Sequence, residues 1–298
     1  MRGAQAILFQ PGFNMYKIKE EIYDFNFPLN IKDKKITSKS VYSVYKKNKV
    51  ISEITTLEGL HTENIVDSLQ EFQSKRYKLP SVKFSKSMID YFKHNTVPSK
   101  IHTALLWPTQ IDKIKNTDTI KIKVGREKPN VENQNLKNII KTQKGLKLRI
   151  DGNRLCTCQQ MLEIIDGIPH GQIDYIEDSF INEHEEKIFH KKTRLIIAMD
   201  EDIRDFFKNK NWKLFPSHIK HVVIKLSLIG GVSELNYLTK NLDRKGVTYN
   251  LSSTFEGELG LKFLYSLSKI KKYKNMTTPG LDTLVFMKKK KGPNKEPL

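Results

Sequence analysis

The sequence predicts an α/β protein in which a parallel α/β sheet or barrel follows a small α+β unit. From about residue 103 the pattern changes, and four short β-branched runs that end in ionisable residues near positions 151, 177, 200 and 225 recur at intervals of about 25 residues, the pitch of a strand-plus-helix unit. Residues 1–95 lack this pitch and instead contain apolar runs separated by polar turns. The change of pattern predicts two structurally different parts.

The N-terminal part predicts a small antiparallel sheet followed by helices. We expect one strand around residues 4–9, and a hairpin with a longer loop formed by residues 41–45 and 50–54. Near the C-terminus, the apolar run 284–287 predicts a strand that returns to this sheet. Apolar residues at helical spacing predict two helices. These residues are Ile65, Val66, Leu69 and Phe72, and then, after Pro80, Met88, Ile89 and Phe92.

Seven strand candidates lie between residues 103 and 275, separated by segments with helical spacing. They are residues 104–106, 119–124, 146–150, 173–176, 195–199, 221–224 and 248–251. A closed eight-unit barrel usually needs more than about 200 residues, so we expect a short barrel with trimmed helices or a missing unit. Residues 288–298 carry a run of lysines that predicts a disordered tail, with an electrostatic tether as the alternative.

The composition limits the class of protein. The net charge is +19, but 44 of the 52 basic residues are Lys and no stripe of aromatic residues accompanies them. This favours a solvated lysine-rich surface, or steering of an anionic substrate, over nucleic-acid binding. We expect no membrane partner and a cytoplasmic protein, because no apolar run is long enough to span a bilayer or form a signal peptide. Cys156 and Cys158 form a lone C-x-C, which argues against a zinc ribbon or a disulfide framework.

Three acidic residues stand at the ends of successive strand candidates: Asp151, Glu177 and Asp200. The C-terminal ends of parallel strands meet at one mouth, so these carboxylates are expected to converge. Oxygen ligands without a nearby His or Cys favour Mg²⁺ or Mn²⁺ over zinc. The alternative for each acid alone is a helix N-cap. The neighbouring acids Asp178, Glu201 and Asp202 are expected to point away from the mouth, by alternation.

Three lysines accompany these acids. Lys121 and Lys123 are two residues apart on one strand, so their side chains point the same way. If they point inward, mutual repulsion and burial lower the pKa of at least one amine, which then serves as a general base. The alternative is a solvated edge strand. Lys225 ends a later strand across the mouth, where its ammonium group could stabilise an anion.

The series continues with Ser252, Ser253 and Gly280, whose hydroxyl groups and open backbone suit carboxylate binding, although a Ser-Ser turn is more often a helix cap. His218 and His221 lie at the opposite end of their strand. We interpret both histidines as structural.

Several of these segments resemble the K-x-K, L-R-x-D-x-N, E-E, D-E and I-K motifs of the enolase superfamily. They are Lys121-Ile122-Lys123, Leu148-Arg149-Ile150-Asp151-Gly152-Asn153, Glu177-Asp178, Asp200-Glu201 and Ile224-Lys225. Further segments resemble the o-succinylbenzoate synthase family within it: residues 1–5, 53–54, 57–59, 80–84 and 279–284. The resemblance runs from residue 1 to about residue 287. In three places the chain departs from the family pattern: Gly152 replaces alanine, while Ser179 and Leu226 each replace proline.

The resemblance implies a modified (β/α) TIM-type barrel with an α+β capping domain. The capping domain would comprise residues 1–97, completed by about 276–290, and the catalytic barrel residues 98–275. The implied reaction is the Mg²⁺-dependent dehydration of 2-succinyl-6-hydroxy-2,4-cyclohexadiene-1-carboxylate to o-succinylbenzoate in menaquinone biosynthesis. The implied partner is thus a small-molecule carboxylate. The oligomeric state stays open, and a monomer is plausible.

The resemblance also implies roles for individual residues. Lys123 would remove the proton next to the carboxylate, Lys121 would tune it, and Lys225 would lie on the other face of the substrate. Asp151, Glu177 and Asp200 would hold Mg²⁺, with Mn²⁺ as a possible substitute. Residues 55–60 would close the site. The positions that would line the substrate are Arg149, Asn153, Ser252, Ser253 and Gly280.

Two other functions remain open. Relatives in the superfamily that racemise N-acylated amino acids or epimerise dipeptides share the two-lysine arrangement, so the lysines alone do not exclude that activity. A basic, non-catalytic binding protein is the alternative from another class. The three acids in register argue against it, because a binding protein has no need of them.

Overall fold

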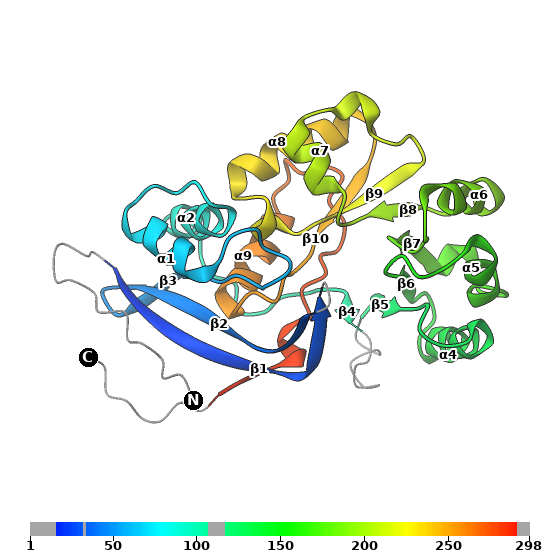
Figure 1. The fold of residues 1–298 in the computed structure, drawn as a ribbon, viewed down its shortest axis with the longest axis horizontal. Helices are drawn as coiled ribbons and strands as arrows, with labels where there is room; N and C mark the ends of the chain where they lie inside the picture. Colours follow the sequence, from blue (N-terminus) through cyan, green and yellow to red (C-terminus); the bar gives the residue numbers. More distant parts are fainter. Residues whose placement is uncertain (1–15, 32–33, 107–116, 291–298) are drawn as a thin grey trace.

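The computed structural model describes residues 16–31, 34–106 and 117–290 and contains two sheets (Figure 1). The strand expected at residues 4–9 and the end of the expected basic tail, residues 291–298, lie outside the described residues. One sheet is antiparallel, with strand order β11-β1-β2-β3, and the other is parallel, with order β10-β9-β8-β7-β6-β5-β4.

The antiparallel sheet contains the predicted hairpin and one long strand that the sequence pattern did not reveal. The hairpin strands are β2 (Lys34–Lys46) and β3 (Lys49–Ile54). They are joined at Lys47 and Asn48, both with positive φ (48° and 60°), so the expected longer loop is wrong: this is a tight two-residue turn of the type that matches strand twist. The unpredicted strand is β1 (Lys17–Ile31).

The C-terminal strand returns to this sheet, as predicted, but begins later than expected. Residues Leu284–Phe286 form a 3₁₀ turn, and β11 (Met287–Lys289) follows and pairs antiparallel with β1. Both predicted helices are present: α1 (Ile65–Gln73), capped by Asn64, and α2 (Pro80–Phe92), which starts at its proline. They cover β3 with a small core that includes Val44, Ile54 and Phe72, whereas Val66 is exposed.

All seven predicted strands of the parallel sheet are present. They are β4 (Leu105–Leu106), β5 (Thr119–Lys123), β6 (Lys147–Asp151), β7 (Ile173–Glu177), β8 (Ile197–Met199), β9 (Ile219–Ile224) and β10 (Thr248–Leu251). The helices between and after them are α4 (Pro129–Thr142), α5 (Cys158–Ile164), α6 (Glu183–Thr193), α7 (Ile203–Asn209), α8 (Val232–Arg244) and α9 (Glu258–Ser268). Short 3₁₀ turns lie at His170–Gln172, Trp212–Leu214 and Leu226–Leu228.

A segment without regular strand structure takes the place of an eighth strand. Residues 275–281 run parallel to β10, with hydrogen bonds from Gly280 N to Leu251 O (2.8 Å) and from Ser253 N to Gly280 O (3.1 Å). On its other side, Pro279 O accepts a hydrogen bond from Ala104 N (2.8 Å), next to β4. The segment therefore links the two edges of the parallel sheet, and the short barrel that the sequence predicts is confirmed.

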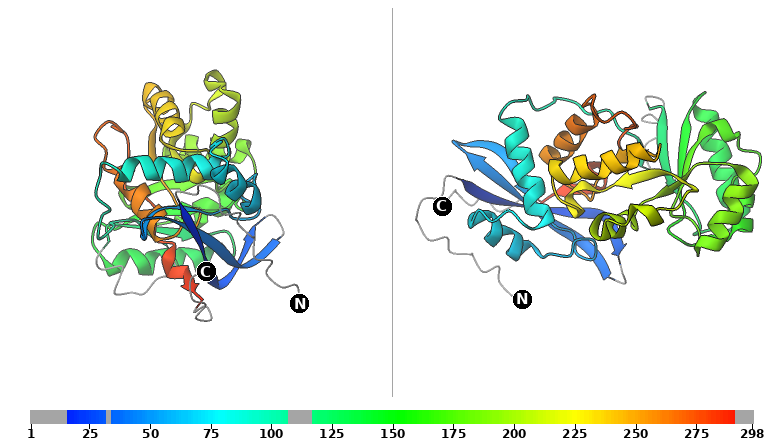
Figure 2. Two further views of the ribbon diagram at one scale, coloured as in Figure 1. Left: turned by 90° about the vertical axis from the view of Figure 1, so that its left-hand side faces the viewer. Right: turned by 90° about the horizontal axis from the view of Figure 1, so that it is seen from above.

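Alternation along the strands separates the two faces of the barrel wall. Outward-facing residues such as Ile120, Ile122, Leu148 and Ile150 are buried in the large core under the helices. The helices α4, α5 and α6 stack along the side of the barrel that lies away from the antiparallel sheet (Figure 2). The buried Cys156 and Cys158 are free cysteines beside the start of α5, as expected for small core side chains.

The antiparallel sheet and its helices contact the barrel near β9, β10 and the helices that follow them. Lys83 of α2 pairs with Glu234 of α8 (2.8 Å). The buried Glu53 of β3 accepts a hydrogen bond from Gly257 N (2.7 Å) at the start of α9. The buried Lys39 of β2 donates to Phe255 O (2.7 Å). These contacts fix one sheet against the C-terminal ends of the other sheet's strands.

Candidate active site

The strand register brings the predicted acids and lysines to one mouth of the barrel. Lys123 is paired in register with Asp151, and Asp151 with Glu177, on the neighbouring strands β5, β6 and β7. Asp200 directly follows β8, and Lys225 directly follows β9. Because all these strands are parallel, the five side chains stand at the same end of the barrel.

Two of the lysines contact the acids directly. Lys121 Nζ lies 2.6 Å from Glu177 Oε1 and 2.9 Å from Asp151 Oδ2, and Lys225 Nζ hydrogen-bonds to Asp200 Oδ2. Although burial disfavours both ammonium groups, the carboxylates raise the pKa of Lys121 well above its usual value and raise the pKa of Lys225 as well. Both lysines are therefore held as cations.

Lys123 differs from the other two lysines. Its side chain is exposed at the mouth, and its Nζ donates to Asn153 Oδ1 (3.2 Å). Surrounding protein atoms partly bury the amine and lower the pKa of Lys123; Asp151 opposes this shift, and repulsion from Lys121 adds to it. Of the three lysines, Lys123 is the one whose amine is most easily neutral.

Asn153 holds Lys123 and Asp151 together. Its side-chain Nδ2 and its backbone N donate to Asp151 Oδ1 at 3.0 Å and 3.1 Å, while its Oδ1 accepts from Lys123. Asn153 has a φ of 46°, a left-handed conformation that asparagine tolerates better than most residues. The structure therefore places this predicted substrate contact at the mouth, beside the lysine.

The donor set suits a hard divalent cation. Three carboxylates at neighbouring strand ends offer the oxygen ligands that Mg²⁺ prefers. Glu177 Oε2 is buried and has no hydrogen-bond partner among the described residues, and burial raises the pKa of Glu177, with Lys121 opposing the shift. A cation beside Glu177 would satisfy this oxygen and stabilise its charge.

With the lysines in contact, no three His, Cys, Asp or Glu side chains in the described ranges are close enough together to ligate one ion. The acids nevertheless fit a cation by their chemistry and by their positions at neighbouring strand ends.

The neighbouring acids support the strand ends from behind. Asp178 accepts hydrogen bonds from the backbone N of Asp200 (3.1 Å) and of Glu201 (3.2 Å). Arg154 Nη2 joins Asp178 (3.3 Å) to Asp202 (2.8 Å). These contacts tie the ends of β6, β7 and β8 together and hold Asp178 and Asp202 behind the strand ends, as predicted. Glu201 instead lines a pocket with Asp200 and Lys225, so the prediction that it points away from the mouth is wrong.

The structure does not bring Arg149 to the mouth. Arg149 lies two residues before Asp151 on β6 and is 2% exposed. Its Nε pairs with Asp174 (2.8 Å), and its guanidinium lies 5.0 Å from the ring of Tyr175. An irregularity in the pairing of β6 with β7 lets Asp174 meet Arg149, which no sequence pattern reveals. The geometry favours a structural role in the barrel interior over the expected substrate contact.

The histidines are structural, as predicted. His221 stacks on Tyr175 at 4.4 Å inside the barrel and contacts Thr248 and Asn250 (both 2.7 Å). His218 contacts Glu186 of α6 (2.6 Å).

Of the remaining predicted substrate contacts, Ser252 and Gly280 lie together, whereas Ser253 has a different role. Ser252 Oγ reaches Gly280 O (3.3 Å), so these two positions lie together at the end of β10. The Ser253 hydroxyl instead donates to the buried Glu256 (2.6 Å) and accepts from Phe255 N (2.8 Å). Ser253 thus serves the turn before α9, the helix-cap alternative, and its hydroxyl is not free for a substrate.

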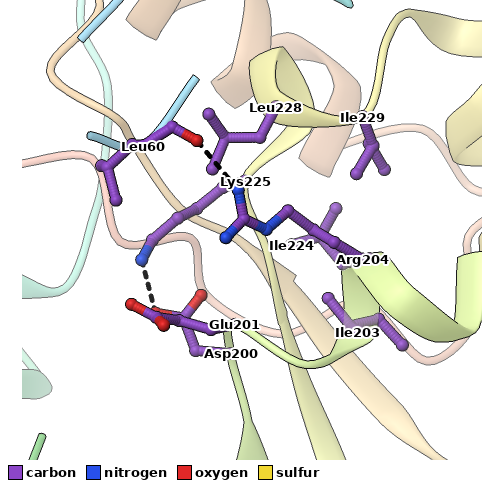
Figure 3. Close-up of a pocket in the computed structure, with 9 residues that line it drawn as sticks. All are labelled: Leu60, Asp200, Glu201, Ile203, Arg204, Ile224, Lys225, Leu228 and Ile229. Atoms are coloured by element: carbon purple, nitrogen blue, oxygen red, sulfur yellow. Dashed lines mark hydrogen bonds and ion pairs between the residues drawn. The ribbon is translucent and has the colours of Figure 1, made fainter. Parts of the chain in front are cut away.

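A small pocket lies over Asp200 and Lys225. The loop of residues 55–61 contributes Leu60 to it, and α7 contributes Ile203 and Arg204. Figure 3 shows Lys225 pointing at Asp200 beneath Leu60, with the Arg204 guanidinium against the Leu60 carbonyl. This places the loop at the mouth of the barrel.

The comparisons identify the fold and its relatives. No family model matches the chain. The o-succinylbenzoate synthase of Pasteurella multocida (strain Pm70) is 29% identical over 181 residues, which cover 59% of this chain and 53% of that protein. Matches to curated relatives of this kind span between 43% and 65% of their length.

Solved structures match over nearly the whole chain. A dipeptide epimerase from Enterococcus faecalis V583, complexed with Mg and the dipeptide L-Leu-L-Tyr, gives a TM-score of 0.67 at 16% identity and covers 92% of this chain and 91% of that one. An o-succinylbenzoate synthase from Thermosynechococcus elongatus BP-1, complexed with Mg, gives 0.65 at 18% identity, covering 90% and 93%.

The chain has the enolase-superfamily fold. The predicted barrel with an α+β sheet against it is thereby confirmed, and the curated homologues are o-succinylbenzoate synthases. In the described part of the chain, no helix combines the length and the apolar character needed to cross a membrane.

Sequence reasoning missed several residues around the mouth. Lys39, Glu53 and Glu256 form a buried charged group between the two sheets, and Arg204 contacts loop 55–61. One signal could have found Arg204. The chain has only eight Arg beside 44 Lys, and Arg149, Arg154 and Arg204 each follow or precede a predicted acid by a few residues.

Proposed function

We propose that the chain is an o-succinylbenzoate synthase: a Mg²⁺-dependent lyase that dehydrates 2-succinyl-6-hydroxy-2,4-cyclohexadiene-1-carboxylate, as in menaquinone biosynthesis. The observation that carries the proposal is the arrangement of Lys123 and Lys225 on different sides of Asp151, Glu177 and Asp200 at one barrel mouth. The similarity to o-succinylbenzoate synthases supports the choice of substrate.

Lys123 is the proposed base. Its lowered pKa makes a neutral amine available, and Asn153 orients it toward the acid cluster. The neutral amine takes the proton from the carbon next to the substrate carboxylate. The resulting ammonium then returns that proton to the departing hydroxyl group, which leaves as water, so one residue serves both steps.

Lys225 and Lys121 have electrostatic roles in this proposal. Both are held as cations by the acids. The Lys225 ammonium stabilises the negative charge that develops on the substrate from the side opposite Lys123. Asp151, Glu177 and Asp200 would hold Mg²⁺, which when bound supplies positive charge beside the substrate carboxylate and makes the neighbouring proton more acidic.

Racemisation or epimerisation is the second candidate. The structure of the dipeptide epimerase superposes as well as that of the o-succinylbenzoate synthase. A racemase needs an acid/base on each face of the substrate, and the two lysines on different sides of the acids satisfy that need too. The substrate itself therefore decides between the two activities.

The proposal is tested with purified protein, the cyclohexadiene carboxylate and an N-succinyl amino acid, with and without Mg²⁺. We expect dehydration that depends on Mg²⁺ and is faster than racemisation. Asp200→Asn should lower the rate by at least about 10²-fold and weaken Mn²⁺ binding, measured by electron paramagnetic resonance, by at least about tenfold.

Asp205→Asn is the matched control, because Asp205 is exposed on α7 five residues from Asp200. It should leave rate and ion binding unchanged. Faster racemisation would support the second candidate, and full activity with full ion binding in Asp200→Asn would refute the assignment of Asp200.

A further inference from the structure

Arg204 joins the barrel to loop 55–61. Its Nη1 donates to the carbonyl oxygen of Leu60 at 2.9 Å, across 144 positions of sequence (Figure 3). Arg204 is the second residue of α7, whose start follows Asp200 by three residues. Its backbone is therefore fixed by the strand end that carries a predicted ion ligand.

The start of α7 is itself firmly held. Asp202, its N-cap residue, pairs with Arg154 (2.8 Å), and Arg154 also contacts Asp178 (3.3 Å). Asp178 in turn accepts the backbone N of Asp200 and Glu201. The Arg204 side chain thus extends from a rigid base toward the loop.

Loop 55–61 has a preformed turn, and its buried Leu57 anchors the start of that turn in the core. Leu60 N and His61 N both donate to Leu57 O (3.1 and 3.0 Å), and Leu57 N donates to His61 Nδ1 (3.0 Å). Gly59 has a φ of +85°, and a Cβ there would lie 2.7 Å from Ile31 Cγ2, so only glycine fits this turn. The exposed Glu58 pairs with the exposed Lys34, which is worth little in water.

Leu60 covers the cationic side of the mouth. It lines the same pocket as Asp200, Lys225 and Arg204, with Ile224, Leu228 and Ile229 as apolar walls. The Lys225 side chain is 20% exposed beneath the loop, and movement of the loop away from it would expose it further. The hydrogen bond from the Arg204 guanidinium to the Leu60 carbonyl holds the loop at the residue that closes the pocket.

We propose that Arg204 is a positioning residue that clamps loop 55–61 over Lys225 and Asp200, so that the bound carboxylate substrate is enclosed. This inference rests on the proposed function for its substrate, but the clamp itself does not. Arg204 acts through Leu60 and touches no reacting atom. Its loss is expected to weaken substrate binding and to leave the chemical step nearly unchanged.

The experiment uses the full chain with Mg²⁺ and three variants. Arg204→Met removes the guanidinium and keeps the length of the side chain, Arg204→Lys keeps one cationic donor, and Arg244→Met is the control, because Arg244 is exposed at the end of α8. Cleavage after Glu58 by a glutamate-specific protease, followed by mass spectrometry, reports how often the loop opens. Steady-state kinetics report KM and kcat, and thermal melts verify that each variant is folded.

Arg204→Met should raise the rate of cleavage after Glu58 and the KM by about tenfold each, with kcat within about threefold of the original. The cleavage rate and KM of Arg204→Lys should lie between those of Arg204→Met and the unaltered protein. Those of Arg244→Met should match the unaltered protein. Equal cleavage rates in Arg204→Met and Arg244→Met would overturn the proposal. So would faster cleavage with unchanged KM, or a fall in kcat alone.

The experiments distinguish failure of the proposed function from failure of the proposed role of Arg204. If the unaltered protein neither dehydrates nor racemises its test substrates, the proposed function is refuted. The protease comparison still decides whether Arg204 holds the loop.

Discussion

Two unusual residues of this chain, Gly152 and Ser179, meet between the ends of β6 and β7. Ser179 Oγ accepts a hydrogen bond from Gly152 N (2.9 Å) and donates to Glu177 O (2.9 Å). A Cβ at position 152 would lie 2.8 Å from Ser179 Cα, which is backbone and cannot turn aside. The two departures from the family pattern therefore lie in direct contact, between the strand ends that carry Asp151 and Glu177.

Gly152→Ala should destabilise the protein by about 1–3 kcal/mol, because the added methyl group must push two strand ends apart. Chemical denaturation measures the change. The control is Gly171→Ala, at a position where a Cβ meets no atom within 4 Å. Equal stability of the two variants would contradict the account of this contact.

At the scale of elements, the sequence predicted the parallel strands well because most are short β-branched runs, and β5 to β9 each end in or are followed by an acid or amine. Strand β1 was missed for a physical reason. Its apolar residues change from even to odd positions within the strand, and its pairing with β2 shifts between Asp24 and Leu29, so no single alternation runs through it.

The candidate site was predictable in part. Strand ends fix the positions of Asp151, Glu177 and Asp200, and these follow from the chain alone. Contacts that depend on packing do not. The pairing of Arg149 with Asp174 needs an irregular register between β6 and β7, which the chain alone does not reveal.

At the interface between the two sheets, a residue of the antiparallel sheet holds the start of α9. Glu53 of β3 is 3% exposed and accepts from Gly257 N (2.7 Å), with Lys39 and Glu256 as charged neighbours. Burial, reinforced by repulsion from Glu256, raises the pKa of Glu53 to about 7, against opposing hydrogen bonds from backbone N–H groups. The folded protein therefore binds this proton more tightly than the unfolded chain does.

The contribution of Glu53 to folding stability decreases as the pH rises. A raised pKa stabilises the folded state fully below the unfolded pKa near 4.5, and this stability is lost as pH rises to about 7. Glu53→Gln removes the titration, so from pH 4.5 to 8 the variant should gain up to about 3 kcal/mol relative to the unaltered protein. Denaturation at several pH values measures this difference. A constant difference would show that Glu53 does not titrate in the interface.

At the scale of the whole molecule, the two sheets contribute different parts of the candidate site. The barrel supplies the acids and lysines at its strand ends, and the antiparallel sheet with its helices attaches beside β9, β10 and α9 and sends loop 55–61 to the mouth. The irregular segment of residues 275–281 closes the barrel. The chain then returns to the antiparallel sheet, where β11 pairs with β1.

The central claim is that Lys123 is the base of a Mg²⁺-dependent reaction at this mouth. The most direct test compares Lys123→Ala with Lys220→Ala, an exposed lysine of β9, in the dehydration assay with Mg²⁺. We predict that Lys123→Ala lowers kcat by at least about 10³-fold while Lys220→Ala retains full activity, with both variants folded. Activity of Lys123→Ala within about tenfold of the unaltered protein would contradict the account, because general-base catalysis contributes at least about 10²-fold.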